Sequence, residues 1–499
     1  MTFIPLVGMI TILALPKNND NLVRWTASVF TAIPLALAVW LYMNFDTANP
    51  GLQFVQQVDW IKAYNIQYYV GIDGLSVPMV LLTALLSFLC VVASWGIDKG
   101  VKGYYAMFLF LETGMIGVFC ALDFFLFFVY WEIMLLPMYF LIGIWGGKNK
   151  VYAAIKFFLY TLFGSVLMLL VMLAMYIYSE PHTFNLIELA KMHAFVGKEL
   201  VLFGWAIPMD KLFWVGLFIG FAIKVPIWPF HTWLPWAHVE APTAVSVILA
   251  GVLLKMGTYG ILRMNYSILP DATMWASNFM MILGVINVIY GACCAMAQKD
   301  LKKLVAYSSV SHMGYVIMGM ASFTTAGVNG AVLQMFNHGT STAMMFLLVG
   351  VLYDRAHHRW IVKPDGSRGF GGIASTVPVY TGYMVIALFA SLGLPGLSGF
   401  ISEALVFLGA FSNPRFQVYV VIGSIGIVLG AGYLLWMFMR VFLGPLNEEY
   451  ANLEDMTWRE KFTLIPLAIL VIVLGVYPMP VLNLMSSTIA QLLTLFNKV

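Results

Sequence analysis

The amino-acid sequence predicts an all-α polytopic membrane protein with about 14 transmembrane helices, arranged as two inverted five-helix repeats with broken helices 7 and 12. Three observations predict this fold. Of the 499 residues, 61% are hydrophobic and 10% are charged, whereas a soluble domain carries roughly 25% charged residues. Apolar runs close to the length of a membrane span follow one another along the chain, and proline and glycine interrupt two of them. This composition excludes a soluble enzyme, a nucleic-acid-binding protein and a disordered scaffold.

The expected helices are the apolar runs between polar breaks. They cover residues 2–16, 25–43, 74–96, 103–120, 122–145, 152–178, 212–231, 242–262, 272–296, 303–320, 327–352, 378–411, 417–443 and 461–482. The run 378–411 is too long for one straight span. Residues 45–72 alternate polar and aromatic side chains, which predicts a small extramembrane hairpin. Residues 484–499 predict a short amphipathic tail.

The positions of lysine and arginine predict the topology. Of the 26 basic residues, 16 lie in one set of alternate loops, which includes Lys17, and seven in the other set, which includes Arg263 and Lys498. Because cytoplasmic loops are enriched in lysine and arginine, the first set is expected in the cytoplasm. Both termini are then expected in the periplasm of a bacterial inner membrane.

Two of the expected spans contain helix-breaking residues. Pro226 and Pro229 interrupt the seventh and should free the carbonyls of Ala222 and Val225, while Pro395 interrupts the twelfth and should free that of Ser391. The breaks lie five spans apart, an odd offset that is typical of inverted repeats. We therefore expect one repeat over 103–262 and a second over 272–443, flanked by 1–102 and 444–499. Two ordinary proline kinks are the alternative interpretation.

Six ionisable residues lie within the expected spans, where an unpaired charge costs at least about 2.5–3.5 kcal/mol. They are Glu132, Lys224, Lys255, His312, His338 and Glu403. The alternative interpretation of Glu132 and Lys224 is an ion pair with a purely structural role. The alternative interpretation of Lys255 is a side chain that extends to the membrane interface. The alternative for the two histidines is a hydrogen-bonded position in the core. The roles of Glu112 and Asp123 stay open.

A series of titratable groups beside broken helices is typical of proton movement. A carboxylate partner raises the pKa of a desolvated lysine, so moving that partner changes whether the lysine holds its proton. We expect Glu132 and Lys224 to form such a switchable pair. Lys255, His312, His338 and Glu403 are expected along one polar axis near mid-membrane, with the histidines as relays.

The four cysteines lie in apolar runs without metal-ligand spacing, so we expect no metal or iron–sulfur cluster on this chain. A haem-binding cytochrome is an alternative of a different class. It requires two histidines facing each other on separate helices, and only His312 and His338 come close to that arrangement.

Several motifs resemble the antiporter-like membrane subunits of respiratory complex I, most closely those of the subunit M type. The similarity covers nearly the whole chain, from about residue 70 to 445. The residues that carry it are Lys224–Pro235 with His238–Thr243, Asp73–Ser76, Trp131-Glu132 with Leu136–Tyr139, Ser311–Gly314, and Phe336–Gly339 with Arg355.

The resemblance implies a proton-translocating subunit of NADH:quinone oxidoreductase. By similarity, Glu132 partners Lys224, Lys255 lies in the central axis with His312 and His338, and Glu403 is the exit residue. No motif for NADH, flavin or iron–sulfur binding is present, so NADH, FMN, clusters and quinone are expected on partner subunits. The other two antiporter-like subunits are the expected neighbours. A subunit of a multisubunit cation/proton antiporter or of a related membrane hydrogenase complex is the alternative.

Overall fold

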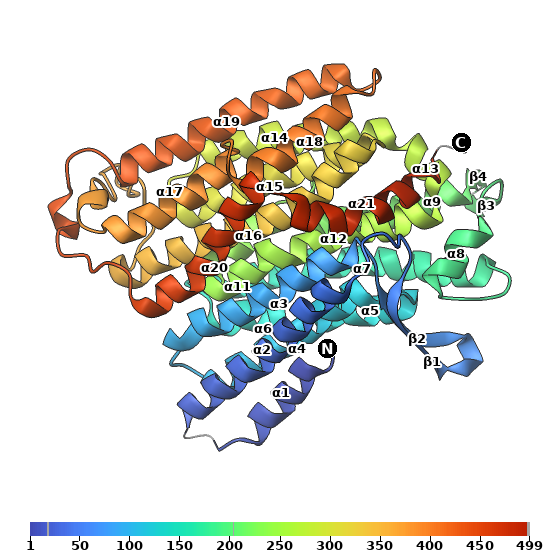
Figure 1. Ribbon diagram of the computed structural model, residues 1–499, viewed down its shortest axis with the longest axis horizontal. Coiled ribbons are helices and arrows are strands. Elements are labelled where there is room, and N and C mark those ends of the chain that lie inside the picture. The colour runs from blue at the N-terminus through green and yellow to red at the C-terminus, as the bar shows by residue number, and fades with distance from the viewer. Residues whose placement is uncertain (17–18, 203, 497–499) are drawn as a thin grey trace.

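The helices of the protein run roughly side by side along one direction (Figure 1). The structure, a computed structural model, describes residues 1–16, 19–202 and 204–496. The N-terminal helices α1 (Ile4–Ala14) and α2 (Asp20–Asn44) form one edge of the bundle, and α19 (Gln417–Val441) lies along the opposite edge. The middles of α16 (Thr325–Ala356) and of the helical segment Thr243–Tyr266 are completely buried. These two therefore form the centre.

The first part of the chain contains eight helices and both hairpins of the described residues, in addition to short 3-10 turns. Its elements after α2 are β1 (Gln53–Ile61), η1 (Lys62–Tyr64), β2 (Ile66–Ile72), α3 (Ser76–Ala93), η2 (Ser94–Gly96), α4 (Val101–Cys120), α5 (Phe124–Ile133), α6 (Leu135–Trp145), α7 (Lys150–Tyr178), α8 (Leu186–Met192), β3 (Glu199–Leu202) and β4 (Trp205–Pro208). The antiparallel pair β1–β2 is the hairpin that the sequence predicted within 45–72. A second antiparallel pair, β3–β4, had not been predicted.

The second part contains the irregular helices. The elements are α9 (Met209–Lys224), α10 (Trp233–Glu240), α11 (Thr243–Ile248), π-helical η3 (Leu249–Leu253), α12 (Leu254–Gly260), π-helical η4 (Ile261–Tyr266), α13 (Pro270–Trp275), α14 (Ser277–Met296), α15 (Leu301–Ala321), then α16, η5 (Ile373–Ser375), α17 (Pro378–Leu392), α18 (Ser398–Phe411), α19, η6 (Glu448–Tyr450), α20 (Trp458–Val476) and α21 (Met479–Leu493).

By length and hydropathy, nine helices of the described residues can cross a membrane, or ten if the bent pair α20–α21 is one span. The protein is thus a polytopic helical membrane protein, and a count of 14 spans stays a prediction. The expected spans that do not reach this length or hydropathy are the brief α1, the two broken spans, whose halves are each short, and the polar α15. The tail expected after residue 483 is part of α21, which turns by 67° from α20.

Both predicted breaks are present. Helix α9 ends at Lys224 and α10 begins at Trp233, and α17 ends at Leu392 before α18 begins at Ser398. The expectation of a free carbonyl at Ala222 was wrong, because the backbone N–H of Ile227 donates to it at 2.9 Å. A wider backbone turn past the proline replaces the helical hydrogen bond that Pro226 cannot form.

An asparagine from a neighbouring helix holds each break. At the first, Asn287 of α14 accepts from the N–H of Trp228 at 2.7 Å and donates to the carbonyl of Pro226 at 3.3 Å. At the second, Asn337 of α16 donates to the carbonyl of Ser398 at 2.7 Å. The first asparagine satisfies backbone groups that a continuous helix would pair internally, and the second ties the first turn of α18 to α16.

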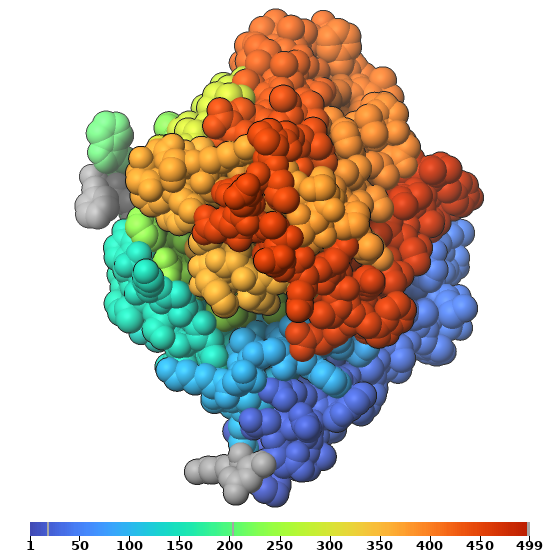
Figure 2. Space-filling model, turned by 90° about the vertical axis from the view of Figure 1, so that its left-hand side faces the viewer, coloured from blue at the N-terminus to red at the C-terminus, as the bar shows by residue number. Residues whose placement is uncertain are grey.

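Alternate loops gather at the same end of the bundle, as the charge pattern predicted. The loops after α3, α6, α10, α14 and α16 line one shared cavity, and the hairpin β1–β2 lies at the other end (Figure 1). Figure 2 looks onto the cavity end, where the orange and red segments beyond α16 and α19 cover much of the face. Lys17 and Lys498 lie outside the described residues.

Candidate functional site

A lysine and a histidine meet at the centre of the bundle. Lys255 is fully buried in α12, and its Nζ lies 2.6 Å from Nδ1 of His338 on α16. The same ammonium also donates to the carbonyl of Ala250 in the preceding π turn. At this distance one proton lies between the two nitrogens. When Lys255 is charged, its ammonium is the donor and Nδ1 of His338 is the acceptor.

Two glycines bring the backbones of these helices together. A Cβ at Gly339 would lie 3.1 Å from the carbonyl oxygen of Gly251 and 2.5 Å from a methyl carbon of Leu82. A Cβ at Gly251 would meet Leu86 at 2.4 Å. Gly251 precedes Lys255 by one helical turn and Gly339 follows His338 directly, so the close approach places the lysine against the histidine.

The polar contacts continue from His338 to the second broken span. The rings of His338 and His312 are 5.5 Å apart between centroids. Nδ1 of His312 lies 3.3 Å from Oε1 of Glu403, and all three side chains are buried. The structure thus brings together four of the six residues that the sequence singled out, in the order Lys255, His338, His312, Glu403. We call this series the central file.

Glu403 lies directly over the second break. A Cβ at Gly393 would stand 2.8 Å from Oε2 of Glu403, and Gly393 has a φ of +79°. Both the conformation and the close carboxylate require glycine at this position. Movement of the break therefore changes the surroundings of the last residue in the central file.

Sequence reasoning missed the amide and hydroxyl groups around this carboxylate. Gln334 lies within hydrogen-bond reach of both His312 and Glu403, at 3.4 and 3.5 Å. Ser402 donates to Gln334 at 2.5 Å and accepts from Asn337 at 3.1 Å. Position 334 is four residues before His338 on the same helix face, and this spacing was the signal available in the sequence.

Lys224 and Glu132 lie apart from the central file and do not form the expected ion pair. Among the described residues, no oxygen of Glu132 lies within 4.0 Å of the ammonium of Lys224. The ammonium instead lies 5.1 Å from the ring centre of Trp131 and 5.7 Å from that of Phe157, in cation–π range. Oε1 of Glu132 is buried without a partner in the described part of the chain.

The end of α9 packs against α12, the helix of Lys255. A Cβ at Gly257 would lie 2.8 Å from the carbonyl oxygen of Phe221 and 2.6 Å from Val225. Lys224 thus ends a helix that contacts the Lys255 helix through glycine. The first break and the central file are adjacent parts of one structure.

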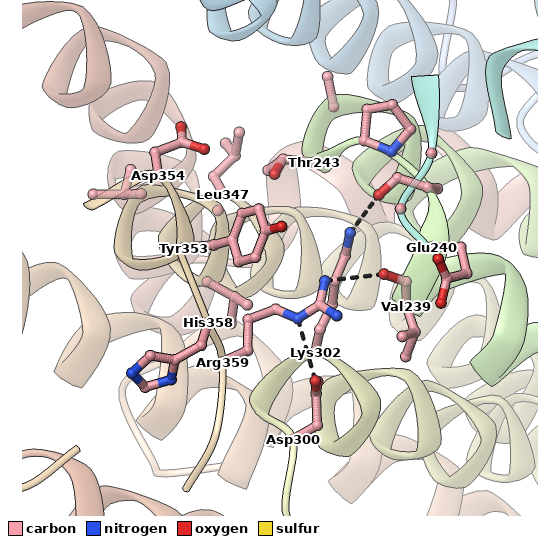
Figure 3. Close-up of a pocket in the computed structure, with 18 of the residues that line it drawn as sticks. Val239, Glu240, Thr243, Asp300, Lys302, Leu347, Tyr353, Asp354, His358 and Arg359 are labelled. Atoms are coloured by element: carbon pink, nitrogen blue, oxygen red, sulfur yellow. Dashed lines mark hydrogen bonds and ion pairs between the residues drawn. The ribbon is translucent and has the colours of Figure 1, made fainter. Parts of the chain in front are cut away.

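A cavity of about 900 Å³ opens at the loop end of the bundle. Lys302 donates to the carbonyl of Ala241 at 2.6 Å. Arg359 pairs with Asp300 at 3.2 Å and donates to the carbonyl of Val239 (Figure 3). Burial and the nearby Lys363 lower the pKa of His358, a lining residue outside the spans, so its ring is neutral at pH 7.

His238, beside this cavity, is a second residue that sequence reasoning passed over. Its ring is fully buried and stacks on Phe346 at 4.6 Å, and neither ring nitrogen has a partner among the described residues. It lies within electrostatic range of Lys302 and Lys255. The residue stands in the motif Lys224–Pro235 with His238–Thr243, which was the signal that could have identified it.

Three further charged residues lie in buried surroundings. Arg263, assigned to a loop from the sequence, is buried and forms two 2.7 Å hydrogen bonds with Asp73. Asp123 caps α5 by accepting from the N–H of Leu126 at 2.9 Å. Glu112 is fully buried in α4, and its carboxylate oxygens have no partner among the described residues. In the same part of the chain, no group of three His, Cys, Asp or Glu could hold a metal ion.

The fold and the central file define a membrane protein with a buried chain of titratable groups between two broken helices. Two family models match the chain: NADH:quinone oxidoreductase/Mrp antiporter transmembrane region over residues 121–430, and NADH-ubiquinone oxidoreductase chain 4 amino terminus over residues 1–121. The chain belongs to the NADH:quinone oxidoreductase/Mrp antiporter family of membrane proteins.

Individual relatives agree along the full length. The chain is 40% identical to NADH-quinone oxidoreductase subunit M of Rickettsia conorii, over 99% of this chain and 98% of the relative. It is 41% identical to subunit M of Rhodobacter capsulatus, over 99% and 95%. A chain of respiratory complex I from Thermus thermophilus matches with a TM-score of 0.86 at 27% identity, over 99% and 98%. A chain of the Mrp complex from a Dietzia species shares the fold, with a TM-score of 0.83 at 19% identity.

Proposed function

We propose that this chain is the subunit M type of proton-translocating subunit in the membrane arm of an NADH:quinone oxidoreductase. The observation that carries the proposal is the central file, in which Lys255, His338, His312 and Glu403 follow one another through the buried centre. Full-length similarity to named M subunits supports the choice of complex. Oxidation of NADH and reduction of quinone then take place on partner subunits, which also hold the FMN and the iron–sulfur clusters.

Protons enter the file from the loop end in this proposal. The cavity has the charged side chains of Lys302 and Arg359 in its lining and opens on that side, and the charge pattern assigns it to the cytoplasm. Both the cavity residue Lys302 and Lys255 are close enough to act electrostatically on the ring of His238. A neutral imidazole with free nitrogens can accept a proton on one side and release it from the other. His238 is therefore the proposed link.

Protons then move along the membrane plane and leave beside the second break. Lys224 of the first repeat and Glu403 of the second lie at corresponding broken helices. Glu403 ends the path, and Lys224 lies beside it, at the end of the helix that packs against α12. Release from Glu403 occurs toward the periplasm, the side on which the charge pattern predicts both termini. The other two antiporter-like subunits are the proposed neighbours on either side, and the breaks are the points at which their movements reach this chain.

The test uses the assembled complex in proteoliposomes, with NADH and a soluble quinone. Glu403→Gln keeps the shape of the side chain and removes the ionisable group. We expect internal acidification to fall roughly tenfold or more, the effect of losing one charged hydrogen bond of about 1.5–3 kcal/mol. The same pumping rate as the unmodified complex would contradict the proposal. Proton movement that requires a sodium gradient and ignores NADH would instead favour the cation/proton antiporter alternative.

A further inference from the structure

An ion pair is buried at the end of the bundle opposite the cavity. Both guanidinium NH groups of Arg263 donate to the carboxylate of Asp73, each at 2.7 Å. The residues are 7% and 4% exposed. A bidentate pair of this kind fixes the orientation as well as the position of both side chains. A surface ion pair would be worth little, but breaking this one leaves a buried charge without a partner.

The pair joins three other helices to the segment Thr243–Tyr266. Asp73 also accepts from the backbone N–H groups of Leu75 and Ser76 at the start of α3. Arg263 donates to the hydroxyl of Tyr259, which in turn donates to the carbonyl of Phe119 in α4. Gly74, next to Asp73, donates to Thr488 of α21 at 3.0 Å. Arg263 is thus held by a rigid frame.

Lys255 and Arg263 belong to one helical segment with unusual winding. The seven-residue α12 carries Lys255 and lies between two π-helical turns, η3 before it and η4 after it. Arg263 lies inside η4, about 12 Å along the axis from Lys255. A π turn contains one residue more than an α turn, so losing or shifting one would rotate α12 about its axis.

Such a rotation would take Lys255 away from His338. The lysine approaches the imidazole from one side only, and its second hydrogen bond goes to Ala250 inside the other π turn. Fixing Arg263 fixes the winding of η4 and therefore the direction in which α12 presents its side chains. The buried ion pair and the lysine–histidine contact are connected through a single short helix.

We propose that Asp73 and Arg263 are positioning residues of the proton path, whose ion pair sets the rotation of α12 and so holds Lys255 against His338. The proposal rests on the proposed function, because it assumes that this contact carries protons. Neither residue touches the central file. Their effect passes through the winding of the segment that contains Lys255.

The experiment compares Asp73→Asn with the unmodified complex in proteoliposomes driven by NADH. The substitution keeps the volume and removes the charge. Because a misplacement of about 1 Å can cost up to about a hundredfold in rate, we expect pumping to fall at least about tenfold. The pH at which pumping is half-maximal should also move by about one unit, because Lys255 loses its fixed acceptor. A role in folding alone would lower the amount of assembled complex and leave this pH unchanged.

Arg263→Lys provides the second variant if Asp73→Asn does not assemble. It keeps the charge but loses the two-pronged contact, so a smaller fall in pumping with the same direction of pH shift is expected. The matched control is Asp59→Asn, the same substitution made at the exposed ion pair with Lys62 in the β1–β2 hairpin, 3.9 Å long and away from both the cavity and α12. It should leave the pH profile unchanged.

Lys255→Ala in the same series separates the two proposals. If Lys255→Ala pumps normally, the proposed function is wrong. If Lys255→Ala stops pumping while assembled Asp73→Asn and Arg263→Lys keep the unmodified rate and pH profile, the ion pair does not position Lys255 and this inference is overturned.

Discussion

Nζ of Lys255 lies 2.6 Å from Nδ1 of His338, although 83 residues separate the two in the chain. The contact is buried. The second hydrogen bond of the Lys255 ammonium goes to a backbone carbonyl and not to a carboxylate. A lysine without an acidic partner gives up its proton more readily than one in an ion pair. The pair is therefore suited to passing a proton from the lysine to the imidazole.

Lys255→Ala is expected to reduce NADH-driven proton pumping more than His312→Ala does. The first variant removes the ammonium that begins the central file. The second removes a relay whose place water can take. Pumping is measured as acidification inside proteoliposomes and normalised to the amount of assembled complex. Equal losses in both variants would contradict the assigned order of importance.

Gly339→Ala tests whether the close approach of two helices positions the lysine. The added Cβ would stand 2.5 Å from a methyl of Leu82 and 3.1 Å from the carbonyl oxygen of Gly251, so the methyl must turn away and the two backbones must shift by a few tenths of an ångström. We expect a loss of pumping of about tenfold without the removal of any titratable group. Gly430→Ala in α19 is the matched control, because a Cβ there meets no atom within 4 Å. A Gly339→Ala complex that pumps like the control would show that the approach is unimportant.

The breaks were predicted correctly because each combines a proline with a second helix-disrupting residue, Pro229 at the first and Gly393 at the second, whereas α2 and α20 continue through single prolines. Position along the chain was enough for that conclusion. The same is true of the hairpin, whose alternation is local. Lys255 and Glu403 were also recognised from the sequence as charged residues within spans, because a charge inside an apolar run is identified without a structure.

Contacts between distant helices could not be predicted in the same way. The expected pairing of Glu132 with Lys224 assumed that two opposite charges on non-adjacent spans, each otherwise unpaired in hydrocarbon, must meet, whereas Trp131 lies beside the lysine. Arg263 was taken for a loop residue because it stands near the end of an apolar run, and only the fold brings it to Asp73. The π turns around Lys255 leave no pattern in the sequence.

Cysteine labelling is expected to place residues 354–368 on the cytoplasmic side. Ser367→Cys, in a background with Cys293 and Cys294 replaced by serine, should react with a membrane-impermeant maleimide only in inside-out vesicles. Ala63→Cys, next to the exposed Tyr64 at the tip of the hairpin, should react only from the outside. Labelling of both positions from one side would contradict the topology and, with it, the inverted repeats.

The last prediction concerns Glu132, whose buried oxygen has no partner while Lys224 lies in a cation–π contact instead of an ion pair. If the function of these residues is to form and break their ion pair, the structure corresponds to the separated state. Glu132→Gln then keeps this state accessible and removes the paired one. We expect assembled complex in normal amounts but pumping reduced at least about tenfold, since the paired state that stabilises the charged form of Lys224 can no longer form. Trp131→Phe is the informative companion, because it keeps an aromatic face beside Lys224 while it removes the indole hydrogen bond to Ser165. It should retain most of the pumping. A Glu132→Gln complex that pumps at the unmodified rate would leave the carboxylate a structural role only.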